Sequence, residues 1–351
     1  MLLYIHIPFC DSKCHYCSFN SYVDKFHLKQ QYMQAVLKQL RSDIALYNVA
    51  KESIETIFIG GGTPSTVEAS LYEPIFSYIK PYLSKNPEIT TEANPNSASK
   101  QWIKGMFLLG INRISFGVQS FNDTKLKFLN RAHSSKDAIS AVQSAKDIGI
   151  DNISLDLIYA TNMDTKEMLQ YDLEQAFELP INHISAYALS IEEGTVFQNT
   201  PDAANHKMDL TQLLFQEIGN HGFTQYEISN FGAYQSRHNL GYWQYKDYIG
   251  IGSGAVGCID GVRYYPDKDI QLYINDPLHV EHETLSLDQQ KDEKILLGLR
   301  SVVGVEISLL TSHEMNRVSI LIQENKVFQK NNKIYNKNYL LSDELALFIT
   351  T

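Results

Sequence analysis

Short runs of β-branched and other apolar residues alternate along the chain with longer stretches in which apolar residues recur at helical spacing. Six runs predict strands, and they begin at Leu2, Thr56, Glu88, Asn112, Asn152 and His183. In the stretch that starts at His27, apolar residues occupy every fourth position from Tyr32 to Ile44, which predicts an amphipathic helix. A second predicted helix starts at Ser134 and ends at Gly149, since glycine is common at helix C-termini.

The order of these elements predicts the fold class. Strand–helix–strand repeats require parallel strands joined by helical crossovers. Six such units predict an α/β protein with a partial (βα)6 barrel, an incomplete, TIM-like relative of the eightfold barrel. The pattern alone also permits a doubly wound open sheet.

Three parts follow from this interpretation: the barrel over residues 1–230, a connecting segment over 231–284 and a smaller module over 285–351. The module combines a capped helix from Ser286, which ends before Gly304, a second helix and a basic, tyrosine-containing hairpin. This order resembles a winged helix, and winged helices often bind DNA. The net charge of −10 argues against a nucleic-acid partner, so we expect the module to be a lid or a partner-docking surface.

Polar residues gather where the predicted strands end. They are a cysteine loop after the first strand, Gly61, Gly62 and Thr63 after the second, Glu92 after the third, Gln119 after the fourth and Asp156 within the fifth. Ligands bind at the carboxyl ends of the strands both in barrels and in open α/β sheets. We therefore expect these residues to share one rim.

Three of the four cysteines, Cys10, Cys14 and Cys17, fall within eight residues, and Cys258 stands alone far downstream. A structural zinc site usually takes two cysteine pairs, and so few cysteines without a secretory signal do not form a disulfide framework. An iron–sulfur cluster takes thiolate ligands, and three cysteines would leave one iron open. A zinc site completed by His6 or His15 is the alternative.

Composition narrows the class of protein. With 351 residues, 44% apolar and 20% charged, the chain is ordinary globular material of a size that favours one large and one small domain. No apolar run approaches the 18 residues of a membrane span. An exposed iron–sulfur cluster needs reducing surroundings, so we expect a cytoplasmic protein that reaches membranes only through its partners.

Individual residues of the rim each have two interpretations. The run GGGTP lets the backbone approach a ligand and present amide groups to it, or it is an ordinary strand-to-helix turn. Arg131 has the planar fork that clamps a carboxylate, or it is a surface cation. Glu92 and Asp156 are ligand contacts or solvated acids.

The cysteine spacing followed by GGGTP resembles the radical S-adenosylmethionine superfamily. The runs YIHIPFC, FIGGGTPS, TEANP, RISFGVQSF, LNRAH and HNLGYW are similar to the branch that holds oxygen-independent coproporphyrinogen dehydrogenase (HemN) and the haem chaperone HemW. The resemblance covers nearly the whole chain. It implies a partial barrel, a [4Fe-4S] cluster whose open iron takes S-adenosylmethionine, and one-electron cleavage that yields methionine and a 5′-deoxyadenosyl radical.

The resemblance also implies roles for particular residues. Cys10, Cys14 and Cys17 would hold the cluster. A first S-adenosylmethionine would contact Tyr4, the backbone of Gly61 and Glu92. Positions that resemble a second S-adenosylmethionine site, so that one or two molecules bind, are Tyr16, Gly62, Thr63, Gln119, Arg131 and Asp156.

Two departures separate the relatives within this branch. HemN continues its motif with a further cysteine and has a longer N-terminal extension, whereas Cys17 is followed here by Ser18 and Phe19. Both departures favour a HemW-like carrier that delivers haem to respiratory proteins, with an electron donor that the sequence does not name. The alternative is a coproporphyrinogen III dehydrogenase, which removes hydrogen from propionate side chains before two decarboxylations. A structural zinc-loop protein is the third hypothesis.

The run HNLGYW resembles a HemW motif associated with haem binding. His238 offers an imidazole for haem iron, and Tyr242 and Trp243 offer aromatic faces. The alternative is a hydrogen-bonded structural histidine with both aromatic rings in a core. Relatives often have a histidine where this chain has Val256, and Cys258 is typical of a small buried residue.

Overall fold

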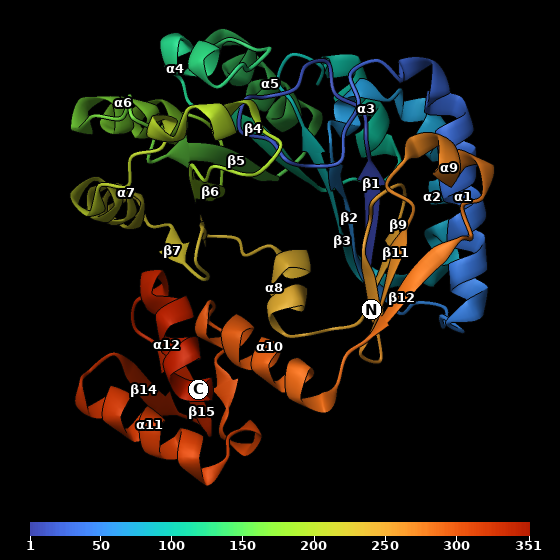
Figure 1. Cartoon of the computed structure of the whole chain (residues 1–351). Helices are drawn as coiled ribbons and strands as arrows, with labels where there is room; N and C mark the ends of the chain where they lie inside the picture. Colours follow the sequence, from blue (N-terminus) through green and yellow to red (C-terminus); the bar gives the residue numbers. More distant parts are fainter.

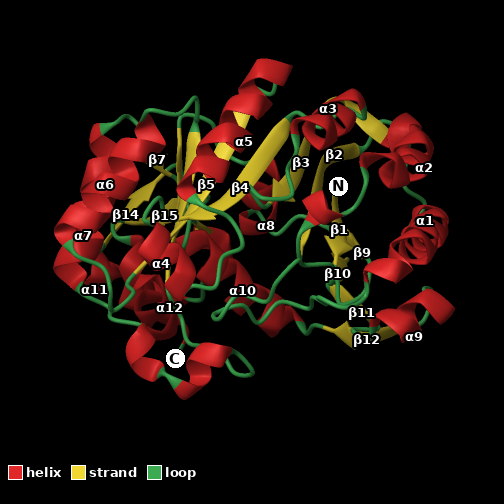
Figure 2. Ribbon diagram, turned by 90° about the horizontal axis from the view of Figure 1, so that it is seen from above, coloured by secondary structure: helices red, strands yellow, loops and turns green.

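The computed structural model describes the whole chain, Met1–Thr351, and a twelve-stranded sheet is its largest feature. Seven central strands pair in parallel in the order β9-β1-β2-β3-β4-β5-β6, and antiparallel strands extend both edges. The strands form an open arc, with α1, α2, α3 and α5 outside it and α8 inside (Figures 1 and 2). The prediction of an α/β fold with an incomplete barrel is confirmed.

The strands of the large sheet are β1 (Leu2–Ile7), β2 (Ile54–Gly61), β3 (Leu83–Ala93), β4 (Arg113–Gln119), β5 (Asn152–Tyr159), β6 (His183–Ala188), β7 (Thr224–Gln225), β8 (Asn230–Gly232), β9 (Tyr248–Ile251), β10 (Gly257–Ile259), β11 (Val262–Pro266) and β12 (Val280–Thr284). The helices that accompany it are α1 (Lys29–Leu46), α2 (Ala69–Ile79), α3 (Lys100–Leu108), α4 (Asp123–Phe128), α5 (Ser135–Ile148), α6 (Lys166–Phe177), α7 (Met208–Asn220), α8 (Arg237–Trp243) and α9 (Ile270–Asn275). None of the helices has an apolar stretch long enough to cross a membrane.

Strand β1 shows how the sequence assigns residues to the two faces of the arc. Successive side chains of a strand point to opposite faces. Leu3, Ile5 and Ile7 join the main hydrophobic core under the outer helices. Tyr4 and His6 therefore face the inside of the arc, where they are available to line a cavity.

The two helices predicted from periodicity and capping are confirmed. Helix α1 buries the four residues of the predicted pattern, Tyr32, Val36, Leu40 and Ile44. Helix α5 begins after Ser134, which forms a capping box with Asp137, and ends at Gly149, whose φ of 107° suits a residue without Cβ.

The predicted connecting segment, 231–284, contributes the strands β9 to β12 to the large sheet. Strand β9 pairs in parallel with β1, and β10, β11 and β12 continue the sheet by antiparallel pairing. These strands have at most five residues each. The boundaries at 230 and 284 stay a prediction.

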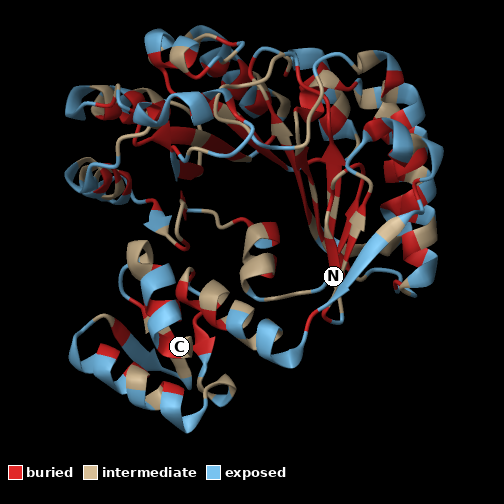
Figure 3. Cartoon of the chain, in the orientation of Figure 1, coloured by how far each residue is buried: buried red, intermediate tan, exposed pale blue.

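The C-terminal residues have a hydrophobic core of their own, made of ten residues between Ile295 and Ile349. Its elements are α10 (Leu287–Leu299), β13 (Val305–Glu306), α11 (Ser312–Gln323), β14 (Val327–Lys330), β15 (Lys333–Asn336) and α12 (Ser342–Thr350). Ser286 caps α10 as predicted, whereas α12 was not predicted. Burial is concentrated along the large sheet, and the outer faces of α11 and α12 are exposed (Figure 3).

Candidate functional site

A cavity of about 380 Å³ lies at the carboxyl ends of the parallel strands; we call it the rim cavity. It collects all but two of the predicted site residues. Those that line it are Cys10, Cys14, Tyr16, Cys17, Gly61, Gly62, Thr63, Glu92, Gln119, Arg131 and Asp156. The two predicted residues outside it are Tyr4 and His238.

The cysteine loop is tied to its surroundings at both ends. The amide of Cys10 donates to the carbonyl of Tyr22 (3.0 Å), and the amide of His15 donates to the carbonyl of Leu129 (3.2 Å). The ring of His15 is also fixed, because its Nδ1 lies 3.0 Å from the carbonyl oxygen of Phe128. The loop is therefore held in place by the protein itself.

The three thiols on this loop fit a cluster better than a single metal ion. All are free, and no group of three or more His, Cys, Asp or Glu side chains is arranged to hold one ion. Burial raises the pKa of Cys10 and of Cys17, while the ammonium of Lys13 opposes the shift in both. A four-iron cluster takes each thiolate at a different iron, so three thiols that line one cavity without converging on a single point suit it.

The glycine turn is shaped by packing against β1. A Cβ on Gly61 would lie 2.4 Å from the ring of His6, and a Cβ on Gly62 would lie 2.8 Å from the carbonyl oxygens of Ile7 and Phe9. The amide of Gly62 donates to Ile7 (2.8 Å) and that of Thr63 to Phe9 (2.7 Å). The amides of Gly62 and Thr63 are thus bonded within the protein, which favours the second interpretation of GGGTP, an ordinary strand-to-helix turn.

Two carboxylates in the rim cavity have no cationic partner. Glu92 accepts a hydrogen bond from the amide of Gly61 (3.1 Å), and Asp156 accepts one from the hydroxyl of Ser115 (3.1 Å). Burial, and then the charge of Asp156, raise the pKa of Glu92 to about 8, and burial raises the pKa of Asp156. Partly buried carboxylates without an ion pair fit a ligand that carries positive charge.

Both terminal nitrogens of Arg131 form hydrogen bonds within the protein, and only Nε has no partner. Its Nη1 donates to Cys14 Sγ and to the hydroxyl of Tyr16, both at 3.3 Å. Its Nη2 donates to Asn94 Oδ1 and to the carbonyl of Gly117, both at 2.6 Å. Nε is buried without a partner, so a single N–H remains for a ligand instead of the expected fork.

Asn94 belongs to the site, although it was not predicted. Its side chain connects two predicted residues, because it accepts from Arg131 and donates to Thr63 Oγ1 at 3.1 Å. The sequence signal was its place two residues after Glu92, in the run TEANP. Gln119 also lines the cavity. Its backbone has a left-handed φ of 69°, next to a register shift between β4 and β5.

His238 has both ring nitrogens occupied. Nδ1 lies 2.7 Å from Thr56 Oγ1 and Nε2 lies 2.9 Å from the hydroxyl of Tyr242, and the residue is 1% exposed. Burial lowers the pKa of His238 to about 3. The amide of His238 donates to Glu88 (2.9 Å) at the start of α8. This placement matches the structural alternative and leaves no free nitrogen for haem iron.

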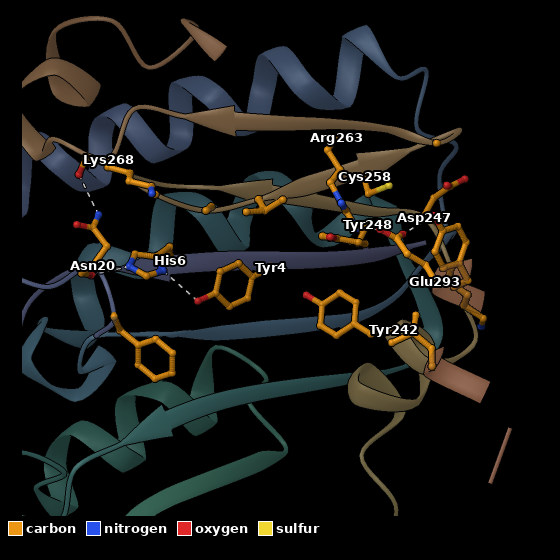
Figure 4. Close-up of a pocket in the computed structure, with 18 of the residues that line it drawn as sticks. Tyr4, His6, Asn20, Tyr242, Asp247, Tyr248, Cys258, Arg263, Lys268 and Glu293 are labelled. Carbon is orange, nitrogen blue, oxygen red and sulfur yellow. Dashed lines mark hydrogen bonds and ion pairs between the residues drawn. The ribbon is translucent and has the colours of Figure 1, made fainter. Parts of the chain in front are cut away.

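Tyr4 lines a second cavity of about 860 Å³, which we call the lateral cavity (Figure 4). Its walls come from β1, β9, β10, β11, the end of α8 and α10. The residues used below are Tyr4, Phe19, Tyr242, Tyr248, Val256, Arg263, Lys268 and Glu293. The sequence singles out Tyr4, Phe19, Tyr242 and Val256 separately, but no sequence pattern indicates that they line one cavity.

The comparisons with known proteins agree on one family. Residues 4–176 match the family model described as the radical SAM superfamily. The chain is 40% identical to heme chaperone HemW of Haemophilus influenzae, over 99% of this chain and 97% of that protein. It is 34% identical to heme chaperone HemW of Bacillus subtilis, over 86% of this chain and 84% of that protein. The chain belongs to the HemW family.

The HemW family thus shares its fold with a solved relative. Coproporphyrinogen III oxidase (HemN) from Escherichia coli superposes with a TM-score of 0.83 over 100% of this chain and 90% of that one, at 20% identity.

Within this HemW-family chain, the two cavities draw on different parts of the sequence. The predicted residues of the rim cavity all lie in the superfamily region, 4–176, whereas most of the lateral cavity comes from residues after 240.

Proposed function

We propose that this protein is a haem chaperone that uses a [4Fe-4S] cluster and S-adenosylmethionine and delivers haem to respiratory proteins. The observation that carries the proposal is the rim cavity, which three free thiols and two carboxylates without an ion pair line together, in a chain whose curated HemW relatives are named heme chaperones.

Cys10, Cys14 and Cys17 would hold the cluster, and the rest of the rim cavity would hold S-adenosylmethionine. Glu92 and Asp156 suit its cationic groups, since neither carboxylate forms an ion pair within the protein. When bound, the cluster and S-adenosylmethionine supply one-electron cleavage of a carbon–sulfur bond. At about 380 Å³ the cavity lies near the lower end of ligand-site volumes, which favours one molecule over two.

The residues around the cysteines orient the ligands and limit their access to water. Asn94 and Arg131 fix Thr63 and Cys14 relative to one another. Glu92 holds the glycine turn through the amide of Gly61. This network fixes the cysteine loop relative to the glycine turn before a ligand binds. Ligand binding therefore costs less conformational entropy of the protein.

A coproporphyrinogen III dehydrogenase is the second candidate. It is favoured by the retention of Glu92, Asp156 and Arg131 around one cavity, because a pure carrier has no evident need for them. Ser18 and Phe19 stand where HemN-like sequences place a further cysteine, which favours the chaperone.

The decisive test is an anaerobic incubation of cluster-reconstituted protein with a reductant, S-adenosylmethionine and coproporphyrinogen III. We expect no product with the oxidation state and carboxyl count of protoporphyrinogen, and we expect stoichiometric binding of ferric protoporphyrin IX followed by its transfer to an apo-haemoprotein. Product above that of a Cys14→Ser control would establish the dehydrogenase instead. Absence of haem binding would refute the chaperone.

The proposal includes a reducing compartment such as the cytoplasm. All four cysteines are free in the structure, and Cys10 would have to stay reduced to bind iron. The electron donor and the respiratory acceptor are to be found among proteins of the same compartment.

A further inference from the structure

We propose that the lateral cavity is the haem-binding site, with the porphyrin ring against its aromatic wall and the carboxylates at the end where Lys268 lies. The proposal rests on the proposed function and adds the place and the orientation of the ligand.

Size and lining suit a large, flat, apolar ligand. The volume of about 860 Å³ lies in the upper part of the range of small-molecule sites, 300–1,000 Å³. Tyr4 and Tyr242 project into the cavity from β1 and α8 (Figure 4). Tyr242 packs edge-on against Tyr248, with ring centroids 4.8 Å apart. Phe19 is 66% exposed although it lies at the cavity wall, so its ring has apolar surface to cover.

Charge distinguishes the two ends of the cavity. At one end Arg263 forms an ion pair with Glu293 at 2.6 Å, and Lys246 forms one with Glu55 at 2.7 Å. At the other end Lys268 lies near Asn20, and its ammonium forms no ion pair (Figure 4). An amphipathic ring with its acidic groups on one edge matches this arrangement, since only the Lys268 end has unpaired positive charge.

His238 takes part by positioning Tyr242. Its Nε2 lies 2.9 Å from the hydroxyl of Tyr242, whose ring lines the cavity, while His238 itself is buried outside it. The HNLGYW run would then contribute to haem binding through Tyr242, and the imidazole of His238 would orient the Tyr242 ring without contacting the haem.

The rim and lateral cavities have a common wall. Ser18 and Phe19 line both of them. These are also the residues that follow Cys17, so haem in the lateral cavity would lie beside the cysteine loop.

The test is a titration of the full-length, cluster-reconstituted protein with ferric protoporphyrin IX. Val256→Trp fills the cavity and should raise the Kd at least about tenfold, because bulk in a binding pocket excludes the ligand. The control Val302→Trp adds the same bulk at an exposed valine of the C-terminal module and should leave the Kd unchanged.

A second pair of variants tests the orientation and does not depend on tolerance of a new tryptophan. Lys268→Glu lies at an exposed side chain and should weaken binding about tenfold, whereas Lys330→Glu, on exposed β14, should have no effect. With the dimethyl ester of the same porphyrin, Lys268→Glu should lose its effect.

The outcomes separate the two proposals. Wild-type protein that binds haem, with Val256→Trp and Lys268→Glu unchanged in Kd, would overturn the lateral cavity as the site and leave the chaperone intact. Wild-type protein that binds no haem would overturn both. Circular dichroism and iron content of each variant show whether a lost affinity reflects lost structure.

Discussion

The rim cavity and the lateral cavity differ in how their charges are balanced. In the rim cavity, Glu92 and Asp156 are partly buried and form no ion pair. In the lateral cavity, Arg263 is neutralised by Glu293, and Lys268 alone remains unpaired. The first arrangement is costly for the protein by itself and fits a small polar cation. The second costs little and fits an apolar ring with acidic groups at one edge.

The largest expected effect is on iron content, which should depend on a cysteine of the rim cavity and not on the cysteine of the lateral cavity. Cys14→Ser should lower the iron content of reconstituted protein at least about tenfold, because an alcohol is a poor iron ligand compared with a thiolate. Cys258→Ser, in the lateral cavity, should leave the iron content unchanged. Iron and sulfide analysis checks both, and equal losses in the two variants would contradict the assignment of the thiols.

His238→Ala tests whether that residue is structural. The change removes two buried hydrogen-bond partners and leaves a hole, so we expect a loss of about 2–4 kcal/mol in the free energy of unfolding. Urea unfolding at pH 7 measures it. Haem that still binds should keep its Soret maximum, and a shift to a different spin state would show instead that the imidazole is an iron ligand.

The variant Glu92→Gln tests whether the unpaired Glu92 carboxylate makes the stability of the protein depend on pH. The pKa of Glu92 is raised from 4.5 to about 8, so the unfolded chain releases this proton at lower pH than the folded protein. Wild-type stability should therefore fall as pH rises from about 4.5 to about 8, by on the order of 2 kcal/mol.

The Glu92→Gln variant should lose this part of the pH dependence and be more stable than wild type near pH 9. Thermal unfolding of both proteins between pH 5 and pH 9 measures the difference. Parallel curves over that range would show that Glu92 is ionised in the folded protein at all of these pH values.

The smallest expected effect concerns a neutralised cation of the lateral cavity. Lys246→Ala removes a half-exposed ion pair with Glu55, so it should cost less than about 1 kcal/mol of stability. It should also change the haem Kd less than about twofold, because that charge is already balanced. If it weakened binding as much as Lys268→Glu, the carboxylates would lie at the opposite end of the cavity.

The rim could be predicted because its residues lie in one repeated structural context. Most lie in the carboxyl-terminal half of a parallel strand or just after it, so the topology brings together residues as distant as Cys10 and Asp156 without knowledge of any side-chain contact. What the sequence could not predict was which hydrogen bonds are already made. The amides of Gly62 and Thr63, and most of the donors of Arg131, are used inside the protein.

The lateral cavity could not be predicted for a different reason. Its walls combine β1, the cysteine loop, β9 to β11 and α10, and only the packed structure shows that these segments meet. The strands β9 to β12 are short, and β9 pairs with β1, which is distant in sequence, so periodicity gives little signal. The burial of His238 likewise depends on Thr56 in β2, far from the HNLGYW run.

Helix α10 belongs both to the C-terminal module and to the wall of the lateral cavity. Ile295 and Leu299 belong to the core of the C-terminal module, while Glu293 and Leu297 line the lateral cavity. We therefore expect local unfolding of the module to open the cavity as well. A ligand seated in the cavity should then slow the hydrogen exchange of amides across the whole module, including those of α11 and α12 that it never touches.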